Sequence, residues 1–171
     1  MHTANRISVT TKGATRTRAL GRKLSKLLRK GDVVLLQGPL GAGKTTFVQG
    51  IGAGFGIEDP VNSPTFVLLA RHDLPAFEDN APHTQRPKAL YHADLFRLTN
   101  IEEVEDLALA EQATEGALLV EWPERGLDAL PAEHLLIAIE FSSEYADERR
   151  LTIVAVGERY HRVLDGLGGR G

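Results

Sequence analysis

Cysteine is absent from this 171-residue chain, which excludes disulfide bridges, thiolate metal ligands and thiol catalysis. No run of about 18 apolar residues occurs, and the N-terminal stretch MHTANRISVTTKG has no apolar core, so neither a membrane span nor a signal peptide is predicted. The net charge is only -3, and no long basic run indicates obligate sequence-specific DNA binding. A soluble, cytoplasmic protein is expected.

The residues that are present suit an ordinary globular protein, with 42% hydrophobic and 25% charged side chains. Strand-like and helix-like segments alternate, which predicts an α/β fold with a mixed sheet and a C-terminal antiparallel hairpin. The expected strands are Arg6–Thr10, Val33–Gln37, Ser63–Arg71, Ala117–Trp122, His134–Phe141 and Arg149–Gly157, and Ala89–Leu98 is expected to be a strand leading to a loop. The expected helices are Thr15–Lys30, one starting at Lys44, a short one capped by Asn100 and a final helical turn over Tyr160–Leu167. The polar, proline-containing segment Asp73–Lys88 predicts a long loop.

One stretch carries a recognisable chemistry. Gly38–Thr45 fits the P-loop pattern G-x-x-x-x-G-K-[ST] and lies between a predicted buried strand and a predicted helix. Glycines let backbone N–H groups surround phosphate oxygens, and the helix directs the positive end of its dipole at the same place. Lys44 would then contact the β- and γ-phosphates, and the Thr45 hydroxyl would bind Mg²⁺. The alternative is a glycine-rich turn with an incidental lysine.

A P-loop needs carboxylates near its metal, because Mg²⁺ prefers oxygen ligands. Glu121 follows four apolar residues of a predicted buried strand, and Asp94 ends the run YHAD. Both are candidate metal or catalytic groups, with a surface acid and a backbone-capping acid as the respective alternatives. Asn62–Phe66 contains Ser63 and Thr65 in a loop that could sense the γ-phosphate, although Ser-Pro-Thr is also an ordinary turn.

Other polar residues give weaker signals. Trp122, the only tryptophan, directly follows Glu121 and lies either in the core or near the nucleotide. The histidines are scattered without metal-ligand spacing, so a structural role is favoured for them.

Four separated motifs, GPLGAGKTTFVQGI, NSPTF, YHADLFRL and LLVEWPERG, together resemble the TsaE family, also called YjeE, over roughly residues 15–150. The resemblance implies a three-layer P-loop NTPase fold with a mixed, mainly parallel sheet. It also implies a partner-dependent ATPase required for N6-threonylcarbamoyladenosine at position 37 of tRNAs that read ANN codons. TsaD and TsaB would be its partners, ATP and Mg²⁺ its cofactors, and tRNA would be met only through that complex.

The family pattern also implies roles for residues of this chain. Glu121, Asp94 and Lys44 would be catalytic, and Thr45, Glu121 and Asp94 would hold the metal. Nucleotide binding would fall to Trp122, Ser63, Thr65 and the loop residues Gly38, Leu40, Gly41, Ala42, Gly43, Lys44, Thr45 and Thr46. Adenine is expected near Thr10–Thr15. Residues 1–160 would form one P-loop ATPase domain and residues 161–171 a frayed tail. The long segment Asp73–Lys88 and Phe96, where the family often has tyrosine, are departures.

Three other functions stay open on the residues alone. A small-molecule kinase would need an arginine-bearing lid, and Arg86, Arg97 and Arg125 show no helical lid pattern around them. A GTPase would need the guanine-reading N-K-x-D pattern, which the chain lacks. A nucleotide-binding module without turnover is the third.

Overall fold

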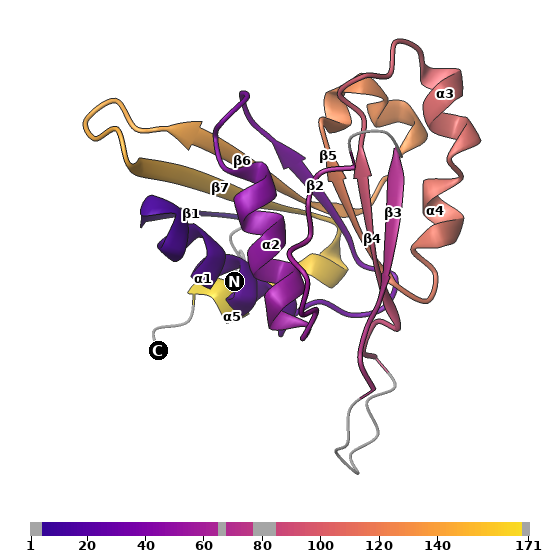
Figure 1. Cartoon of the computed structure of the whole chain (residues 1–171), viewed down its shortest axis with the longest axis horizontal. Helices are drawn as coiled ribbons and strands as arrows, with labels where there is room; N and C mark the ends of the chain where they lie inside the picture. Colours follow the sequence, from indigo (N-terminus) through magenta and orange to yellow (C-terminus); the bar gives the residue numbers. More distant parts are fainter. Residues whose placement is uncertain (1–4, 65–67, 77–84, 169–171) are drawn as a thin grey trace.

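A computed structural model describes residues 5–64, 68–76 and 85–168 of the chain. Within these residues, seven strands form one sheet in the order β1-β7-β6-β2-β5-β4-β3 (Figure 1). The strands are β1 Arg6–Lys12, β2 Val33–Gln37, β3 Leu69–Asp73, β4 Ala89–Asp94, β5 Ala117–Glu121, β6 His134–Phe141 and β7 Glu148–Val156. The helices are α1 Gly13–Ser25, α2 Lys44–Gly54, α3 Ile101–Asp106, α4 Leu109–Gln112 and α5 His161–Gly168, with short 3-10 turns at Pro123–Arg125, Leu127–Ala129 and Glu158–Tyr160.

The centre of the sheet is parallel. Strands β6, β2, β5 and β4 pair in parallel, whereas β1, β7 and β3 join by antiparallel pairing. The sequence VVLLQ of β2 is a continuous apolar run because both faces of a central parallel strand are covered. The carboxyl ends of β2, β5 and β4 therefore lie together at one edge, where open α/β sheets bind ligands.

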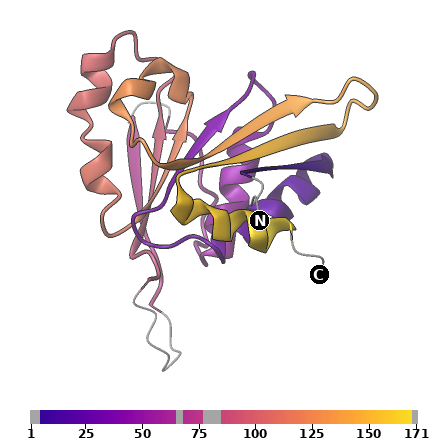
Figure 2. The ribbon, with the colours of Figure 1, turned by 180° about the vertical axis from the view of Figure 1, so that it is seen from behind.

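Helices cover both faces, which makes three layers (Figures 1 and 2). Helices α1, α2 and α5 pack on one face, in a core that contains Leu24, Phe47 and Val163. Helices α3 and α4 pack on the other face through Val104 and Leu109. The expected three-layer α/β architecture with a C-terminal β6–β7 hairpin is confirmed, and it matches a P-loop NTPase fold.

Helices α1 and α2 approach each other closely because glycines face the contact. A Cβ added at Gly50 would collide with the backbone of Arg18, and one added at Gly21 would collide with the backbone of Phe47 and approach Ile51. The glycine-rich sequence of α2, which costs helix propensity, is thus explained by close packing of the P-loop helix against α1.

Gly50→Ala is expected to destabilise the fold by about 1–3 kcal/mol, since overpacking against rigid backbone outweighs the gain of up to about 1 kcal/mol in helix propensity. Thermal unfolding would show this as a melting temperature lower by about 3–10 °C. Ala53→Gly, at an exposed position of the same helix, is the control for propensity alone. A higher melting temperature for Gly50→Ala would show that the two helices can separate freely.

The C-terminal segment differs from expectation. Residues His161–Gly168, expected both as a final helical turn and as part of a frayed tail, form α5, and Val163, Leu164 and Leu167 are buried in the core. Arg159 and Arg162 donate to the buried carboxylate of Asp32 at 2.8 and 2.7 Å, just before β2. The helical turn is therefore confirmed, whereas the frayed tail was wrong for residues 161–168, because the apolar side of this short helix packs beside α1, β1 and β7.

The segment Asp73–Lys88 is also more ordered at its ends than a plain loop. Asp73 pairs with Ala89 at the end of the β3–β4 ladder, and the Leu74 N–H donates to the Lys88 carbonyl at 3.0 Å. Leu74 packs against the core, and the Lys30 N–H donates to the Gln85 carbonyl at 2.8 Å. The described ends of this segment thus belong to the fold, while residues 77–84 lie outside the described part.

Candidate functional site

The loop between β2 and α2 has the conformation that its glycines allow. Gly38, Gly41 and Gly43 have φ values of 154°, 79° and 110°. Residues that carry a side chain rarely adopt such positive φ values. A Cβ on Gly38 would collide with the Ile139 carbonyl oxygen of β6. Arg149 of β7 holds the other side of the loop, since its Nε donates to the Ala42 carbonyl at 3.1 Å. The result is a side-chain-poor cradle in front of the N-terminus of α2, where backbone N–H groups suit an anion.

Lys44 is folded back onto this loop. Its Nζ donates to the Gly38 and Pro39 carbonyls at 2.6 and 3.0 Å and lies 4.2 Å from the centroid of the Trp122 ring. The residue is only 5% exposed. Burial lowers the pKa of Lys44, while the carboxylates of Glu121, Glu124 and Asp94 oppose that shift. The ammonium group is therefore short of solvent, and a bound anion would compensate it.

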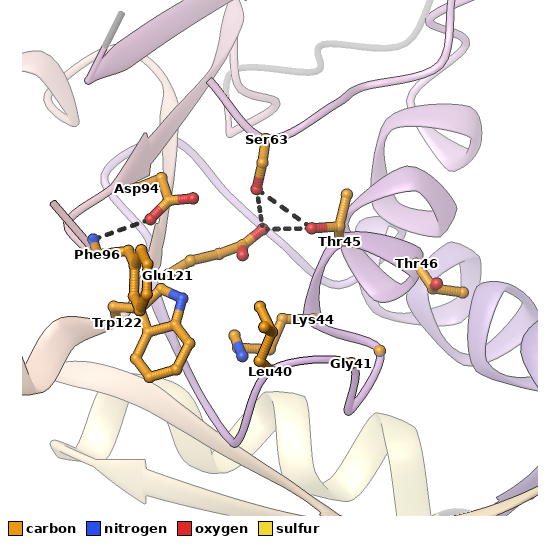
Figure 3. Close-up of a pocket in the computed structure, with 11 residues that line it drawn as sticks. Leu40, Gly41, Lys44, Thr45, Thr46, Ser63, Asp94, Phe96, Glu121 and Trp122 are labelled. Atoms are coloured by element: carbon orange, nitrogen blue, oxygen red, sulfur yellow. Dashed lines mark hydrogen bonds between the residues drawn. The ribbon is translucent and has the colours of Figure 1, made fainter. Parts of the chain in front are cut away.

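Glu121, the last residue of β5, is the centre of a hydrogen-bond cluster and is 2% exposed. Its Oε1 accepts from the Thr45 hydroxyl at 3.2 Å and from the Ser63 hydroxyl at 3.3 Å (Figure 3). The same oxygen lies 3.0 Å from Nε2 of His92. The two hydroxyls are also 3.2 Å apart. Three segments distant in sequence thus meet on one carboxylate oxygen.

Asp94 ends β4 and is paired in register with Glu121 on the neighbouring parallel strand. This pairing explains why two carboxylates lie side by side at the carboxyl edge of the sheet. The Asp94 Oδ1 accepts from the Phe96 backbone N–H at 3.0 Å, which turns the chain away from the strand. Asp94 therefore lines the same pocket as Glu121.

Trp122 adopts a left-handed conformation, with φ of 57°, which is unusual for a bulky residue. Its ring packs against Phe96 with centroids 4.8 Å apart. Opposite it, Leu40 of the loop is 78% exposed. Together these residues border a pocket of about 370 Å³, lined by Leu40, Gly41, Gly43, Lys44, Thr45, Thr46, Ser63, Asp94, Phe96, Glu121 and Trp122 (Figure 3).

Most residues selected from the sequence thus gather around one pocket. Gly38 and Ala42 belong to the cradle but not to the pocket wall, and Ala42 is fully buried. Thr65 lies outside the described residues. His92 was missed, because a lone histidine without ligand spacing favours a structural role. The alternation in YHAD was the available signal, since it puts His92 on the same face of β4 as Asp94.

The carboxylates of this pocket alone would not complete the coordination shell of a divalent cation. Among the described residues, no group of three His, Cys, Asp or Glu side chains could hold a metal by itself. The Thr45 hydroxyl and the carboxylates of Glu121 and Asp94 are oxygen donors, which Mg²⁺ prefers, and Mg²⁺ commonly completes its shell with water and phosphate oxygens. The donor set fits Mg²⁺ bound together with a phosphate ligand.

The glycine loop, its lysine and a glutamate at the end of a strand surround one pocket. Together with the three-layer sheet architecture, this arrangement defines a P-loop NTPase fold. The comparisons with known proteins specify the family. Residues 11–151 match the family model of TsaE, described as threonylcarbamoyl adenosine biosynthesis protein. The chain belongs to the TsaE family, as its four motifs indicated.

Relatives and a solved structure agree over most of the chain. The TsaE protein of Streptomyces coelicolor is 41% identical over 146 residues, which cover 84% of this chain and 93% of that protein. The Bacillus subtilis TsaE protein is 38% identical over 155 residues, covering 88% and 87% of the two chains. The crystal structure of Bacillus subtilis YdiB superposes with a TM-score of 0.75 at 28% identity and covers 98% of this chain and 97% of the other. These names associate the family with biosynthesis of the tRNA nucleoside threonylcarbamoyladenosine.

None of the helices in the described residues is long and apolar enough to cross a membrane.

Proposed function

We propose that this protein is a Mg²⁺-dependent ATPase that acts with the TsaD–TsaB complex in forming N6-threonylcarbamoyladenosine at position 37 of tRNAs reading ANN codons. The observation that carries the proposal is the convergence of Lys44, the Thr45 hydroxyl and the buried Glu121 carboxylate on one pocket at the mouth of the P-loop. ATP is favoured over GTP because the chain lacks the N-K-x-D pattern. Adenine contacts are expected near Thr10–Thr15.

Phosphate binding would change the partners of Lys44. In the structure its ammonium group bonds two loop carbonyls. Phosphate oxygens are stronger acceptors for a charged donor than neutral carbonyls. Lys44 would therefore turn from the loop to the β- and γ-phosphates, while loop N–H groups and the start of α2 surround the remaining oxygens.

The metal would be held by Thr45 together with Glu121, Asp94 or both. When bound, Mg²⁺ neutralises charge that develops on the transferred phosphoryl group. Thr45 would exchange its hydrogen bond to Glu121 for the metal, and Ser63 would be released from Thr45 at the same time. The switch-like response of the Ser63 segment to the γ-phosphate follows from that exchange.

Hydrolysis consumes ATP and one water and releases ADP, inorganic phosphate and a proton. A carboxylate accepts hydrogen bonds only, so Glu121 can orient a water by accepting one of its protons in a hydrogen bond. Its buried position in the pocket wall, shielded from solvent, strengthens that interaction in the charged transition state.

Localisation in the cytoplasm is part of the proposal.

Phosphate release is expected to rise when the cognate TsaD–TsaB complex is added, because a switch segment is ordered most where a partner contacts it. Release would be measured with and without that complex. Binding to the complex would be measured with ATP, with ADP and without nucleotide, and is expected to require ATP. Unchanged turnover together with nucleotide-independent binding would contradict the switch function. A phosphorylated small molecule in place of free phosphate would instead indicate a kinase.

A further inference from the structure

His92 is a fully buried polar residue directly behind Glu121. It lies on β4 with 0% exposure, and its Nε2 is 3.0 Å from Oε1 of Glu121. Strand β4 lies between β3 and β5, and Ala93 pairs with Val120 next to the Asp94–Glu121 pair. The register between β4 and β5 thus fixes where the imidazole meets the carboxylate.

The hydrogen bond also determines which nitrogen carries a proton. An ionised carboxylate only accepts, so Nε2 must be the donor. Within the described residues, the other ring nitrogen, Nδ1, is buried without a hydrogen-bond partner. A buried polar atom without a partner costs stability. Replacing the imidazole by an apolar side chain would remove that cost but would also take a donor from the buried Glu121 carboxylate, so the bond to Glu121 is what the imidazole contributes here.

The three hydrogen-bond donors to Glu121 differ in whether their bonds would persist when nucleotide and metal bind. In the proposed function, the Thr45 hydroxyl turns to the metal. Ser63 lies in an irregular segment between α2 and β3. His92 alone comes from a strand within the sheet, so it is the donor that does not depend on the nucleotide state.

We propose that His92 is the positioning residue for Glu121: its Nε2–H holds Oε1, so that Oε2, which accepts no hydrogen bond from the described residues, serves the metal or the attacking water. This inference rests on the proposed ATPase function. It extends the role of the site beyond the groups that touch nucleotide, since His92 does not line the pocket.

His92→Leu is expected to lower kcat for ATP hydrolysis about 10–100-fold, the usual effect of removing an outer partner of a metal-site ligand. Affinity for ADP without metal should change by no more than about threefold, since no phosphate contact is lost. His92→Gln, whose amide nitrogen can reach the position of Nε2, should restore most of the rate. His72→Leu is the matched control, since His72 also has a buried nitrogen without a partner among the described residues but does not bond Glu121.

A double-mutant cycle separates positioning from general damage. If His92 acts through Glu121, His92→Leu should have little further effect on kcat in a Glu121→Gln background. Equal fold losses in both backgrounds, or wild-type turnover by His92→Leu, would overturn the proposal. Where His92→Leu fails to fold, the His92→Gln rate decides: a loss as large as that of Glu121→Gln counts against the proposal.

A measurement that does not depend on ATP hydrolysis tests this inference separately from the ATPase proposal. Nitrogen-15 NMR of the wild-type imidazole should show the proton on Nε2, with a hydrogen-bonded signal that changes in Glu121→Ala. A protein that hydrolyses no ATP even with its partners, yet shows this signal, would contradict the ATPase proposal and leave the His92–Glu121 pairing in place. A proton on Nδ1 alone would overturn the positioning role whatever the turnover.

Discussion

Lys44→Ala is expected to weaken ATP binding by about 100-fold or more and to abolish measurable turnover. A charge-assisted hydrogen bond contributes about 1.5–3 kcal/mol, which corresponds to roughly 10–150-fold in affinity for a single contact. Lys44 would contact two phosphates, and no other lysine or arginine lines the pocket in the described residues. Calorimetric titration with ATP and Mg²⁺ measures the loss directly.

The nucleotide-free variant should still fold. Removing Lys44 takes away two hydrogen bonds to the loop, but it also removes an ammonium group whose charged form burial disfavours. These effects oppose each other, so the melting temperature should change by no more than about 4 °C. Lys26→Ala is the control, because Lys26 is exposed at the end of α1. A folded Lys44→Ala variant that binds ATP as tightly as wild type would exclude the proposed phosphate role.

The strands of the sheet centre could be predicted from the sequence because their burial leaves a direct pattern. VVLLQ and ALLVEW are continuous apolar runs, and both became central parallel strands. Asn100 was recognised as a cap from its position before IEEVED, and its Oδ1 accepts from the Glu103 N–H at 3.0 Å. Such local signals depend on a few neighbouring residues, which is why they could be found without the tertiary structure.

Element ends were predicted less well because competing contacts decide them. The leucine spacing predicted a helix to Lys30, whereas α1 ends at Ser25, whose hydroxyl donates to the Arg22 carbonyl at 2.7 Å. Leu28 and Leu27 then both donate to the Leu24 carbonyl, which closes the helix with a turn. Strand β3 starts at Leu69 rather than Ser63, because its pairing with β4 sets its bounds.

The part of the candidate site that depends on neighbouring residues could be predicted from the sequence, whereas the part that depends on the assembled sheet could not. The P-loop spacing is local, so Gly38 to Thr45 were found as a unit. The meeting of Glu121 with Asp94 depends on the register between β5 and β4, and the contact with His92 depends on which face of β4 it occupies. Those relations appear only when the sheet is assembled.

Glu121→Gln is expected to leave ATP binding within a few-fold of wild type and to reduce phosphate release about 100–1,000-fold, the effect typical of losing one preorganised electrostatic group. The amide keeps the size of the side chain and one acceptor oxygen, so the hydrogen bonds from Thr45, Ser63 and His92 can persist. What it loses is the negative charge, which matters most where the metal or the attacking water is held in the transition state. The loss should therefore appear in kcat rather than in the dissociation constant.

Asp94→Asn is the matched comparison, since it makes the same chemical change on the neighbouring strand of the same pocket. Glu121 bonds the Thr45 hydroxyl, the expected metal ligand, whereas Asp94 bonds the Phe96 N–H. If Glu121 holds the metal directly, Glu121→Gln should raise the Mg²⁺ concentration for half-maximal turnover more than Asp94→Asn does. The reverse order would assign the metal to Asp94 and leave Glu121 to the water. Wild-type phosphate release by Glu121→Gln, with partners present, would show that this buried carboxylate serves only the structure.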